Sequence, residues 1–304
     1  MGLEILFLGI GGALLFYGGD WLVDGIEGLA TSCRLPSVLV AFVVMGFGTS
    51  APELFVAVQA TLAGAPDIAM GNVVGSNIAN LLLVLAVTAL VMPLAIDRNV
   101  LRIDGGAMLL SALALCAVAW DGMVSRSDAL MLILGMLSYL GSRYWTLPES
   151  AAVDDNPAQG HSVSIFRCVT ALVTLPVGAY LFIDGAVGIA KLVGVSETII
   201  GLTVVALGTS LPEMASCVAA ALRRNSDMVL GGVLGSNVFN GTIVLGSAAL
   251  TVPLPVSPDF TGFWIPVMLV GSVITLIFLR SGFVLSRREA SIMLIGYFAV
   301  FLSI

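Results

Sequence analysis

The sequence predicts an all-α polytopic membrane protein whose ten transmembrane helices form two inverted-topology repeats of five. Composition is the first reason, because 59% of the 304 residues are hydrophobic and only 10% are charged, against about a quarter charged in soluble domains. Length is the second, because the apolar residues form stretches of about 20, enough to cross a bilayer core. The third is a repeat of polar motifs between the two halves of the chain.

Ten apolar stretches follow one another along the chain, and we expect a membrane-spanning helix in each. They cover residues 3–30, 37–62, 68–92, 101–120, 127–146, 164–190, 197–221, 227–250, 260–280 and 287–304. The first stretch is too long for a signal peptide and lacks a cleavage pattern, so we expect a helix there as well. The polar segment LPESAAVDDNPAQGHSV separates two sets of five stretches. We therefore expect a first repeat over 1–146, a linker over 147–163 and a second repeat over 164–304.

The repeat rests on two motifs that recur at a constant offset of 160 residues. GTSAPE at 48–53 and GSNIAN at 75–80 return as GTSLPE at 208–213 and GSNVFN at 235–240. Of the 35 positions that contain both motifs, 15 are identical between the halves without a gap. Because each half has an odd number of spans, the second half enters the membrane from the opposite side. Inverted repeats of this kind are typical of secondary transporters.

The lysines and arginines predict the orientation in the membrane. If the N-terminus lies outside, ten arginines fall on the inner side and only Arg126 and Lys191 fall on the outer side. Positive residues accumulate on the cytoplasmic side of membrane proteins. We therefore expect a multi-pass protein of the plasma membrane with both termini outside and the central linker in the cytoplasm.

Several other functions lack the residues that they require. The net charge is −7 and no basic patch occurs, so we expect no nucleic-acid partner. His161 is the only histidine and lies in the polar linker, which argues against a histidine metal site or a Ser-His-Asp triad. The four cysteines show no CxxC spacing, so neither a disulfide framework nor a zinc site is supported. We expect no cofactor and no enzymatic activity.

Glu53 and Glu213 lie near the middle of their apolar stretches, where a charge costs at least a few kcal/mol. Their equivalent positions in an inverted repeat would bring them together on one axis at mid-membrane. Pro52 and Pro212 lack an N–H and distort the helix, which exposes backbone carbonyls. Hydroxyl oxygens come from the four neighbours Thr49, Ser50, Thr209 and Ser210. Carboxylate, hydroxyl and carbonyl oxygens are hard ligands, suited to Na⁺ and Ca²⁺.

The second motif adds neutral oxygens and close helix contacts. Ser76 and Asn80 are four residues apart and share one helix face, as do Ser236 and Asn240. The glycines of this motif have G-xxx-G spacing, which allows helices to approach closely; they are Gly71, Gly75, Gly231 and Gly235. We expect Asn77 and Asn237 to donate hydrogen bonds between helices, and Asp67 and Asp227 to cap helix N-termini.

The paired GTSxPE and GSNxxN motifs resemble the α-repeats of the calcium/cation antiporter superfamily, and the compact prokaryotic sodium/calcium exchanger branch is the most similar. The resemblance covers essentially the whole chain. It implies an antiporter that exchanges Na⁺ for Ca²⁺ by alternating access, with four central helices around the ions and two long helices that slide across them. We expect the protein to function as a monomer. The ligands that the resemblance implies are Thr49, Ser50, Glu53, Ser76, Asn80, Thr209, Ser210, Glu213, Ser236 and Asn240, with the backbone carbonyls of Gly46 and Ala206.

The chain departs from this family pattern at two places. Many sodium/calcium exchangers carry an aspartate at one of the positions of Asn80 and Asn240, whereas this chain has asparagine at both. Two carboxylates therefore remain, and two Na⁺ per Ca²⁺ would make exchange electroneutral, whereas three would move charge. Gly232 stands where the first half has Asn72.

Three alternatives remain beside Na⁺/Ca²⁺ exchange. Two facing carboxylates could share protons, as in a proton/cation antiporter. An intramembrane hydrolase could use Glu53 and Glu213 as acid and base with Ser50 or Ser210 as nucleophile, but no histidine lies in the membrane and no GxSxG motif occurs. A passive cation channel fits inverted repeats with interrupted helices less well than an antiporter does.

Overall fold

The computed structural model describes residues 2–145, 160–193, 208 and 210–302, and these residues are almost entirely helical. The first half contains α1 Gly2–Cys33, α2 Ser37–Thr49, α3 Ala51–Leu62, α4 Pro66–Ala79, η1 Asn80–Val84, α5 Leu85–Val91, β1 Leu94–Ala95, α6 Arg98–Val100, η2 Leu101–Gly105, α7 Gly106–Ala119, β2 Met123–Val124 and α8 Arg126–Trp145. The second half contains α9 His161–Leu192, α12 Leu211–Leu222, α13 Ser226–Phe239, η4 Asn240–Val244, α14 Leu245–Thr251, β3 Leu254–Pro255, η5 Phe260–Trp264, α15 Ile265–Arg280, β4 Val284–Leu285 and α16 Arg287–Leu302.

Seven segments of the described chain are long and apolar enough to cross a membrane. They are Gly2–Cys33, Ser37–Leu62, Pro66–Val91, Arg98–Ala119, His161–Leu192, Ser226–Thr251 and Phe260–Arg280. The stretches expected over 127–146 and 287–304 appear as the helices α8 and α16, which are not among these seven segments. About half of the stretch expected over 197–221, residues 197–207 and 209, lies outside the described residues, and its end forms α12.

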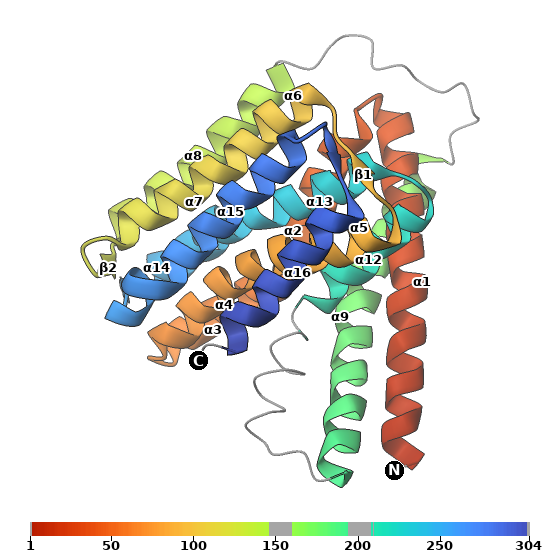
Figure 1. Cartoon of the computed structure of the whole chain (residues 1–304), viewed down its shortest axis with the longest axis horizontal. Coiled ribbons are helices and arrows are strands. Elements are labelled where there is room, and N and C mark those ends of the chain that lie inside the picture. Colours follow the sequence, from red (N-terminus) through yellow and green to blue (C-terminus); the bar gives the residue numbers. More distant parts are fainter. Residues whose placement is uncertain (1, 146–159, 194–207, 209, 303–304) are drawn as a thin grey trace.

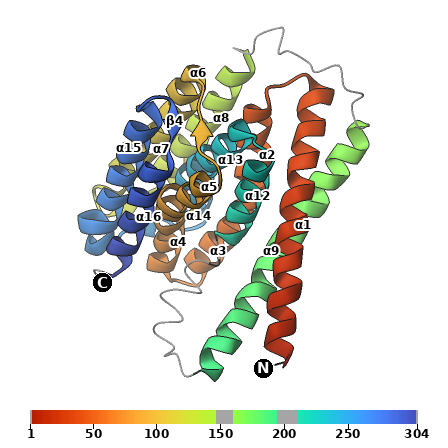
Figure 2. The same cartoon turned by 45° about the vertical axis from the view of Figure 1, so that its right-hand side comes forward.

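The helices α1 and α9 lie side by side at one edge of the bundle and extend beyond the other helices (Figures 1 and 2). Glycines allow this contact, because a Cβ on Gly185 would lie 2.5 Å from the Glu4 carbonyl oxygen. A Cβ on Gly178 would lie 3.0 Å from the Leu15 nitrogen. Small residues at such positions let two backbones touch, so α1 and α9 form one closely fitted pair.

The centre of the bundle is formed by the segments that carry the GSN motifs. Pro66–Val91 and Ser226–Thr251 are the most buried of the seven membrane-length segments. In their apolar windows of 18 residues, 83% and 94% of the residues are buried. Helix α13 touches α2 directly, because a Cβ on Gly235 would lie 2.5 Å from the Phe42 carbonyl oxygen. Gly231 meets the Val38 carbonyl in the same way. The predicted close packing at the GxxxG spacing is therefore confirmed for the second half.

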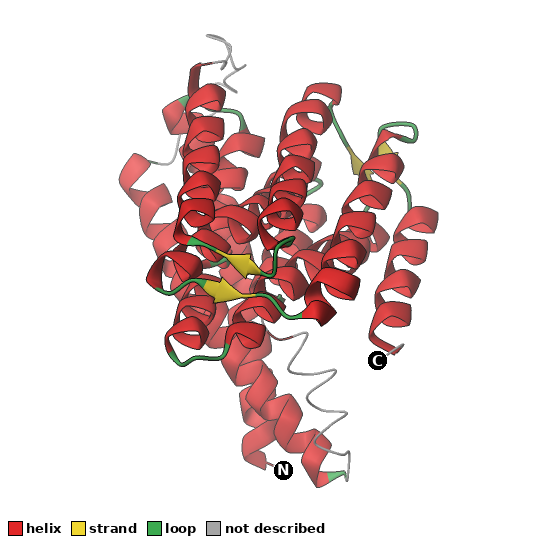
Figure 3. Cartoon of the chain, turned by 90° about the vertical axis from the view of Figure 1, so that its left-hand side faces the viewer, coloured by secondary structure: helices red, strands yellow, loops and turns green. Residues whose placement is uncertain are grey.

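Contacts between the halves are reciprocal. Strand β1 pairs with β4 and β2 pairs with β3, both antiparallel, and Figure 3 shows the two pairs apart from each other. Arg126 at the start of α8 donates to the carbonyls of Leu250 and Thr251, at 3.2 and 3.1 Å. Arg287 at the start of α16 donates to those of Leu90 and Val91, at 3.0 and 3.1 Å. Each half thus closes the end of a central helix in the other half.

The expectation that Asp67 and Asp227 cap helix N-termini is wrong. Helix α4 begins after Ala65 with Pro66 as its first residue, and α13 begins after Asn225. The Asn225 side chain accepts the hydrogen bond of the Met228 N–H at 3.1 Å. Proline fits the first helical position because it has no N–H to satisfy. Both aspartates therefore lie inside the first turn, where the helix dipole favours a negative charge.

Candidate cation site

The GTSxPE motif breaks a helix in two instead of bending it. The sequence predicted one distorted helix over 37–62, but α2 ends at Thr49 and α3 begins at Ala51. Ser50 between them has a non-helical backbone, with φ −84° and ψ 2°. Proline is disfavoured inside a helix but well suited to a first turn, so Pro52 starts a new helix. Glu53 consequently lies in the first turn of α3, where the N-terminal end of the helix dipole stabilises a carboxylate.

The second motif copies this arrangement at the start of α12. Ser210, with φ −92° and ψ 4°, precedes the helix, and Pro212 and Glu213 lie in its first turn. Gly208 and Ser210 are buried. Thr209 and Ala206 lie outside the described residues, so their predicted roles as ligands stay predictions.

The GSN motifs meet the same region through two turns of π-helix. Helix α4 passes into η1 at Asn80, and α13 passes into η4 at Asn240. A π-turn inserts an extra residue into the helix, and such turns occur frequently at functional sites. The sequence predicted ordinary helix here, because a π-turn depends on tertiary contacts and has no strong residue signature. Ser76 and Ser236 lie one turn before Asn80 and Asn240 and are also buried.

Glu53 and Glu213 are both buried, with 1% and 2% of each residue exposed, and their charges interact with each other. Ser76 faces the Glu53 carboxylate and Thr49 faces the Glu213 carboxylate. The Thr49 and Ser236 hydroxyl oxygens are 3.5 Å apart. The structure thus brings α2, α3, α4, α12 and α13 together around two carboxylates.

Most polar atoms of this cluster have no hydrogen-bond partner within the described part of the chain. The unpaired groups are the Ser50 and Ser210 hydroxyls, both carboxylate oxygens of Glu53 and of Glu213, and the amides of Asn80 and Asn240. A buried polar group without a partner costs free energy, and a buried charge costs much more. Oxygen lone pairs coordinate cations. A cluster of buried oxygens without hydrogen-bond partners therefore indicates a cation-binding site.

Two carboxylates and neutral oxygens make up this ligand set. The described residues contain no group of three or more His, Cys, Asp and Glu that could hold a metal ion. Thr49 donates its hydroxyl hydrogen to the Met45 carbonyl at 2.7 Å, which leaves the oxygen lone pairs available. A Cβ on Gly46 would lie 2.8 Å from the Gly235 carbonyl carbon, so Gly46 allows α2 and α13 to touch at the site. The predicted ligand role of the Gly46 carbonyl stays a prediction.

The two glutamates are held differently, which explains the departure at Asn72 and Gly232. Asn72 of α4 donates its side-chain amide to the Glu53 carbonyl at 2.9 Å. A Cβ on Gly232 would lie 2.1 Å from the Met45 sulfur, so a side chain there would require Met45 to move. In the second half the Ser216 hydroxyl, within α12 itself, donates to the Pro212 and Glu213 carbonyls at 2.8 and 3.0 Å. Asn72 is a residue that the sequence analysis did not assign to the site.

Replacing Asn72 by alanine should weaken Ca²⁺ binding at the site. Loss of one such hydrogen bond costs about 1 kcal/mol, which corresponds to about five-fold in a binding constant. We expect the half-saturating Ca²⁺ concentration of transport to rise about five-fold while the maximal rate changes less than about two-fold. Asn99→Ala, at an exposed position, is the matched control. An unchanged half-saturating concentration in Asn72→Ala would show that this bond does not position Glu53.

The predicted helix-to-helix donors are confirmed. The Asn237 amide donates to the Asn77 carbonyl at 3.3 Å and so joins α13 to α4. The Asn77 amide donates to the Met268 sulfur at 3.6 Å and joins α4 to α15. These bonds lock the central helices together beside the site.

Membrane-length helices around a buried oxygen cluster define this chain as a helical membrane protein with a candidate cation site at its centre. The family model described as "Sodium/calcium exchanger protein" matches residues 3–145 and 163–304. The chain belongs to this family.

Individual relatives agree along the whole chain. The "Inner membrane protein YrbG" of Escherichia coli is 32% identical over 307 residues, covering 97% of this chain and 94% of that protein. The "Sodium/calcium exchanger MaX1" of Methanosarcina acetivorans is 29% identical over 97% of this chain and 96% of its own length. A solved structure of the sodium-calcium exchanger NCX_Mj superposes with a TM-score of 0.86 at 31% identity, covering 99% of this chain and 98% of that one.

Proposed function

We propose that this protein exchanges Na⁺ for Ca²⁺ across the membrane at a site built on Glu53 and Glu213. The observation that carries the proposal is the pair of buried carboxylates surrounded by unpaired neutral oxygens. The names of MaX1 and NCX_Mj, both sodium/calcium exchangers, support the choice of ions. The protein acts as a transporter and needs no resident cofactor.

The ligand set suits both ions. Ca²⁺ takes six to eight oxygens in a flexible geometry, and its two charges balance two carboxylates. The hydroxyls of Thr49, Ser50 and Ser210 and the amides of Asn80 and Asn240 supply neutral oxygens, which favour Na⁺ beside a shared carboxylate. Thr209, Ser76, Ser236 and the carbonyls of Gly46 and Ala206 complete the proposed set. Because the two ions use overlapping oxygens, the site does not hold a full complement of both.

Alternating access follows from an inverted repeat. In our proposal, ten transmembrane helices form two repeats, residues 1–146 and 164–304, joined by the cytoplasmic linker 147–163. The reciprocal strand pairs β1–β4 and β2–β3 support a two-fold relation between the halves. The closely fitted pair α1 and α9 slides across the central helices and opens the site to one side at a time. Both termini lie outside the plasma membrane, and one chain suffices for transport.

Charge makes the cycle obligatory. An empty site would carry two bare carboxylates through a buried intermediate, which costs far more than a site neutralised by cations. One Ca²⁺ or two Na⁺ neutralise Glu53 and Glu213 equally well. With asparagine at both 80 and 240, we propose an electroneutral exchange of two Na⁺ for one Ca²⁺.

Uptake of ⁴⁵Ca²⁺ into proteoliposomes tests the function. We expect uptake into vesicles preloaded with Na⁺, and none into vesicles preloaded with K⁺ or N-methylglucamine. Vesicles preloaded with acidic buffer form the third arm. Uptake driven by the pH gradient instead of Na⁺ would assign the site to a proton-coupled antiporter. Uptake that does not saturate and needs no counter-ion would indicate a channel.

A further inference from the structure

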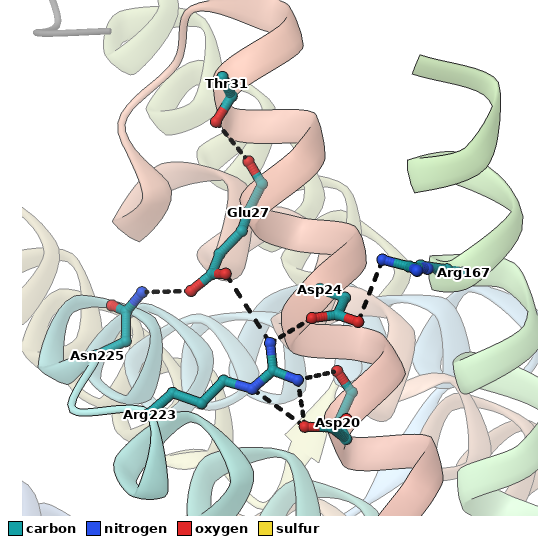
Figure 4. A network of polar contacts seen from close by, with 7 residues as sticks. All are labelled: Asp20, Asp24, Glu27, Thr31, Arg167, Arg223 and Asn225. Carbon is teal, nitrogen blue, oxygen red and sulfur yellow. Dashed lines mark hydrogen bonds and ion pairs between the residues drawn. The ribbon is translucent and has the colours of Figure 1, made fainter. Parts of the chain in front are cut away.

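Arg223 stands where the central helix α12 ends, beside the edge helix α1. Its Nε donates to Asp20 Oδ1 at 3.0 Å, and its terminal nitrogens bind Asp20 and Asp24. The same guanidinium lies 3.9 Å from Glu27 Oε2. Figure 4 shows this one arginine facing three carboxylates of α1. A terminal nitrogen also donates to the Asp20 backbone carbonyl at 3.4 Å, and all of these polar contacts can break and re-form.

The three carboxylates form a regularly spaced row along α1, which we call the ladder. Asp20, Asp24 and Glu27 follow one another by four and three residues and therefore share one face of α1. At 1.5 Å per residue, the midpoint of Asp24 and Glu27 lies about 5 Å along the helix from the midpoint of Asp20 and Asp24. A shift of α1 by about one helical turn would move Arg223 from the first pair to the second. Asp24 would stay bound throughout, so the arginine would never be unpaired.

Helix α1 is tied to α9 by contacts that do not depend on the core. Arg167 of α9 lies 3.2 Å from Asp24, on the carboxylate oxygen that Arg223 does not use. A Cβ on Gly25 would lie 2.5 Å from the Cys168 sulfur of α9. Arg167 and Asp24 can therefore travel together, while Arg223 stays with the core.

The opposite end of the core has no such ladder. Ala63 stands 160 residues before Arg223, and Tyr180 and Val187 stand at the same offset from Asp20 and Glu27. Asp184, the counterpart of Asp24, is exposed and has no ion pair among the described residues. Among the described residues, the device therefore lies at one end of the core.

We propose that Arg223 and the three carboxylates form a charge ratchet that sets the register of α1 against the core. In the present register Arg223 binds Asp20 and Asp24 and lies 3.9 Å from Glu27, and in the alternate register it binds Asp24 and Glu27 and leaves Asp20. One-turn shifts of this kind connect discrete states in other proteins. This inference rests on the sliding of α1 and α9 in the proposed transport cycle, and in the proposed orientation the alternate register moves α1 outward by about 5 Å.

Spin labels on α1 and on the core measure the register directly. Leu3 of α1 and Leu62 of α3 are 59% and 58% exposed and accept labels in a background with the four cysteines replaced. In proteoliposomes, Asp20→Asn should raise the population of a second Leu3–Leu62 distance, longer by up to about 5 Å, above its wild-type level. Glu27→Gln should lower that population below the wild-type level and slow exchange about ten-fold at an unchanged half-saturating Ca²⁺ concentration. Arg224→Gln, an exposed charge beside the ladder, should behave as the wild type.

Asp20→Asn and Glu27→Gln should shift the Leu3–Leu62 distance distribution in opposite directions. A salt bridge with a merely structural role would not give this result. Asp20→Asn should have no further effect in an Arg223→Gln background, because the shared partner is gone. Shifts of the same sign for Asp20→Asn and Glu27→Gln would overturn the ratchet, as would an unchanged distribution in Arg223→Gln. If Asp20→Asn does not fold, the test rests on Glu27→Gln, because the Glu27 side chain is half-exposed and its replacement should not disturb folding. Wild-type ⁴⁵Ca²⁺ uptake in the same vesicles tests the exchange function separately, since the distances do not depend on which ion is carried.

Discussion

Glu213→Gln should abolish Na⁺-driven Ca²⁺ uptake, and Glu53→Gln should do the same. Glutamine keeps the size of the side chain but removes the charge, and removing one partner of a buried ionic contact costs about 3–5 kcal/mol. That corresponds to about two to three and a half orders of magnitude in Ca²⁺ affinity. At the Ca²⁺ concentration that half-saturates the wild type, the ⁴⁵Ca²⁺ uptake of Na⁺-loaded proteoliposomes should therefore fall by at least about 50-fold.

The matched control for these variants is Glu289→Gln. Glu289 accepts hydrogen bonds from the Ser286 backbone and hydroxyl at the start of α16, at 2.9 and 2.6 Å. Glutamine replaces glutamate in such a capping box, so the control loses a carboxylate and keeps its fold. Wild-type uptake in Glu213→Gln, with the protein recovered as a single folded species, would contradict a site centred on the two glutamates.

Asn240→Asp should convert electroneutral exchange into exchange that moves charge. A third carboxylate beside Glu53 and Glu213 would hold one more cation, so that three Na⁺ would return for each Ca²⁺. Moving one elementary charge across the membrane changes the free energy by about 2.3 kcal/mol for each 100 mV of membrane potential. We expect wild-type uptake to be independent of a valinomycin-set potential, and uptake by Asn240→Asp to change several-fold over 100 mV.

The equivalent variant of the first half provides an internal check. Asn80→Asp adds the same charge from η1 and should also make uptake sensitive to voltage. Asn99→Asp, at an exposed position outside the site, should leave uptake independent of voltage. Voltage-sensitive uptake by the wild type would show that the two-carboxylate site already binds three Na⁺, and the proposed stoichiometry would then be wrong.

The sequence was sufficient for the features that follow from composition and from identity between the halves. Apolar stretches of membrane length predicted the described helices to within a few residues, because hydrophobic length is fixed by the bilayer and not by neighbouring residues. The paired motifs singled out Glu53 and Glu213, because a carboxylate in an apolar helix is rarely accidental. The structure buries both and brings them within electrostatic reach of each other.

Tertiary contacts decided what these patterns left open. The break at Ser50 and the π-turns at Asn80 and Asn240 depend on how helices from both halves press on one another. The bond from Asn72 to Glu53 and the close approach of Met45 to Gly232 can be recognised only once it is known which helix lies opposite.

Arg223 makes the same point over a longer separation. The sequence placed it among the ten inner arginines, and nothing in the sequence links it to the carboxylates of Asp20, Asp24 and Glu27, about 200 residues earlier in the chain. A charge pattern along one helix gives its face but not its partner, because the partner is chosen by packing of apolar and glycine surfaces elsewhere. Sequence by itself therefore identified a helical membrane protein, showed the repeat between the two halves and singled out Glu53 and Glu213 as candidate ion ligands. Only the fold decided how the halves hold each glutamate and where the edge helix is tied to the core.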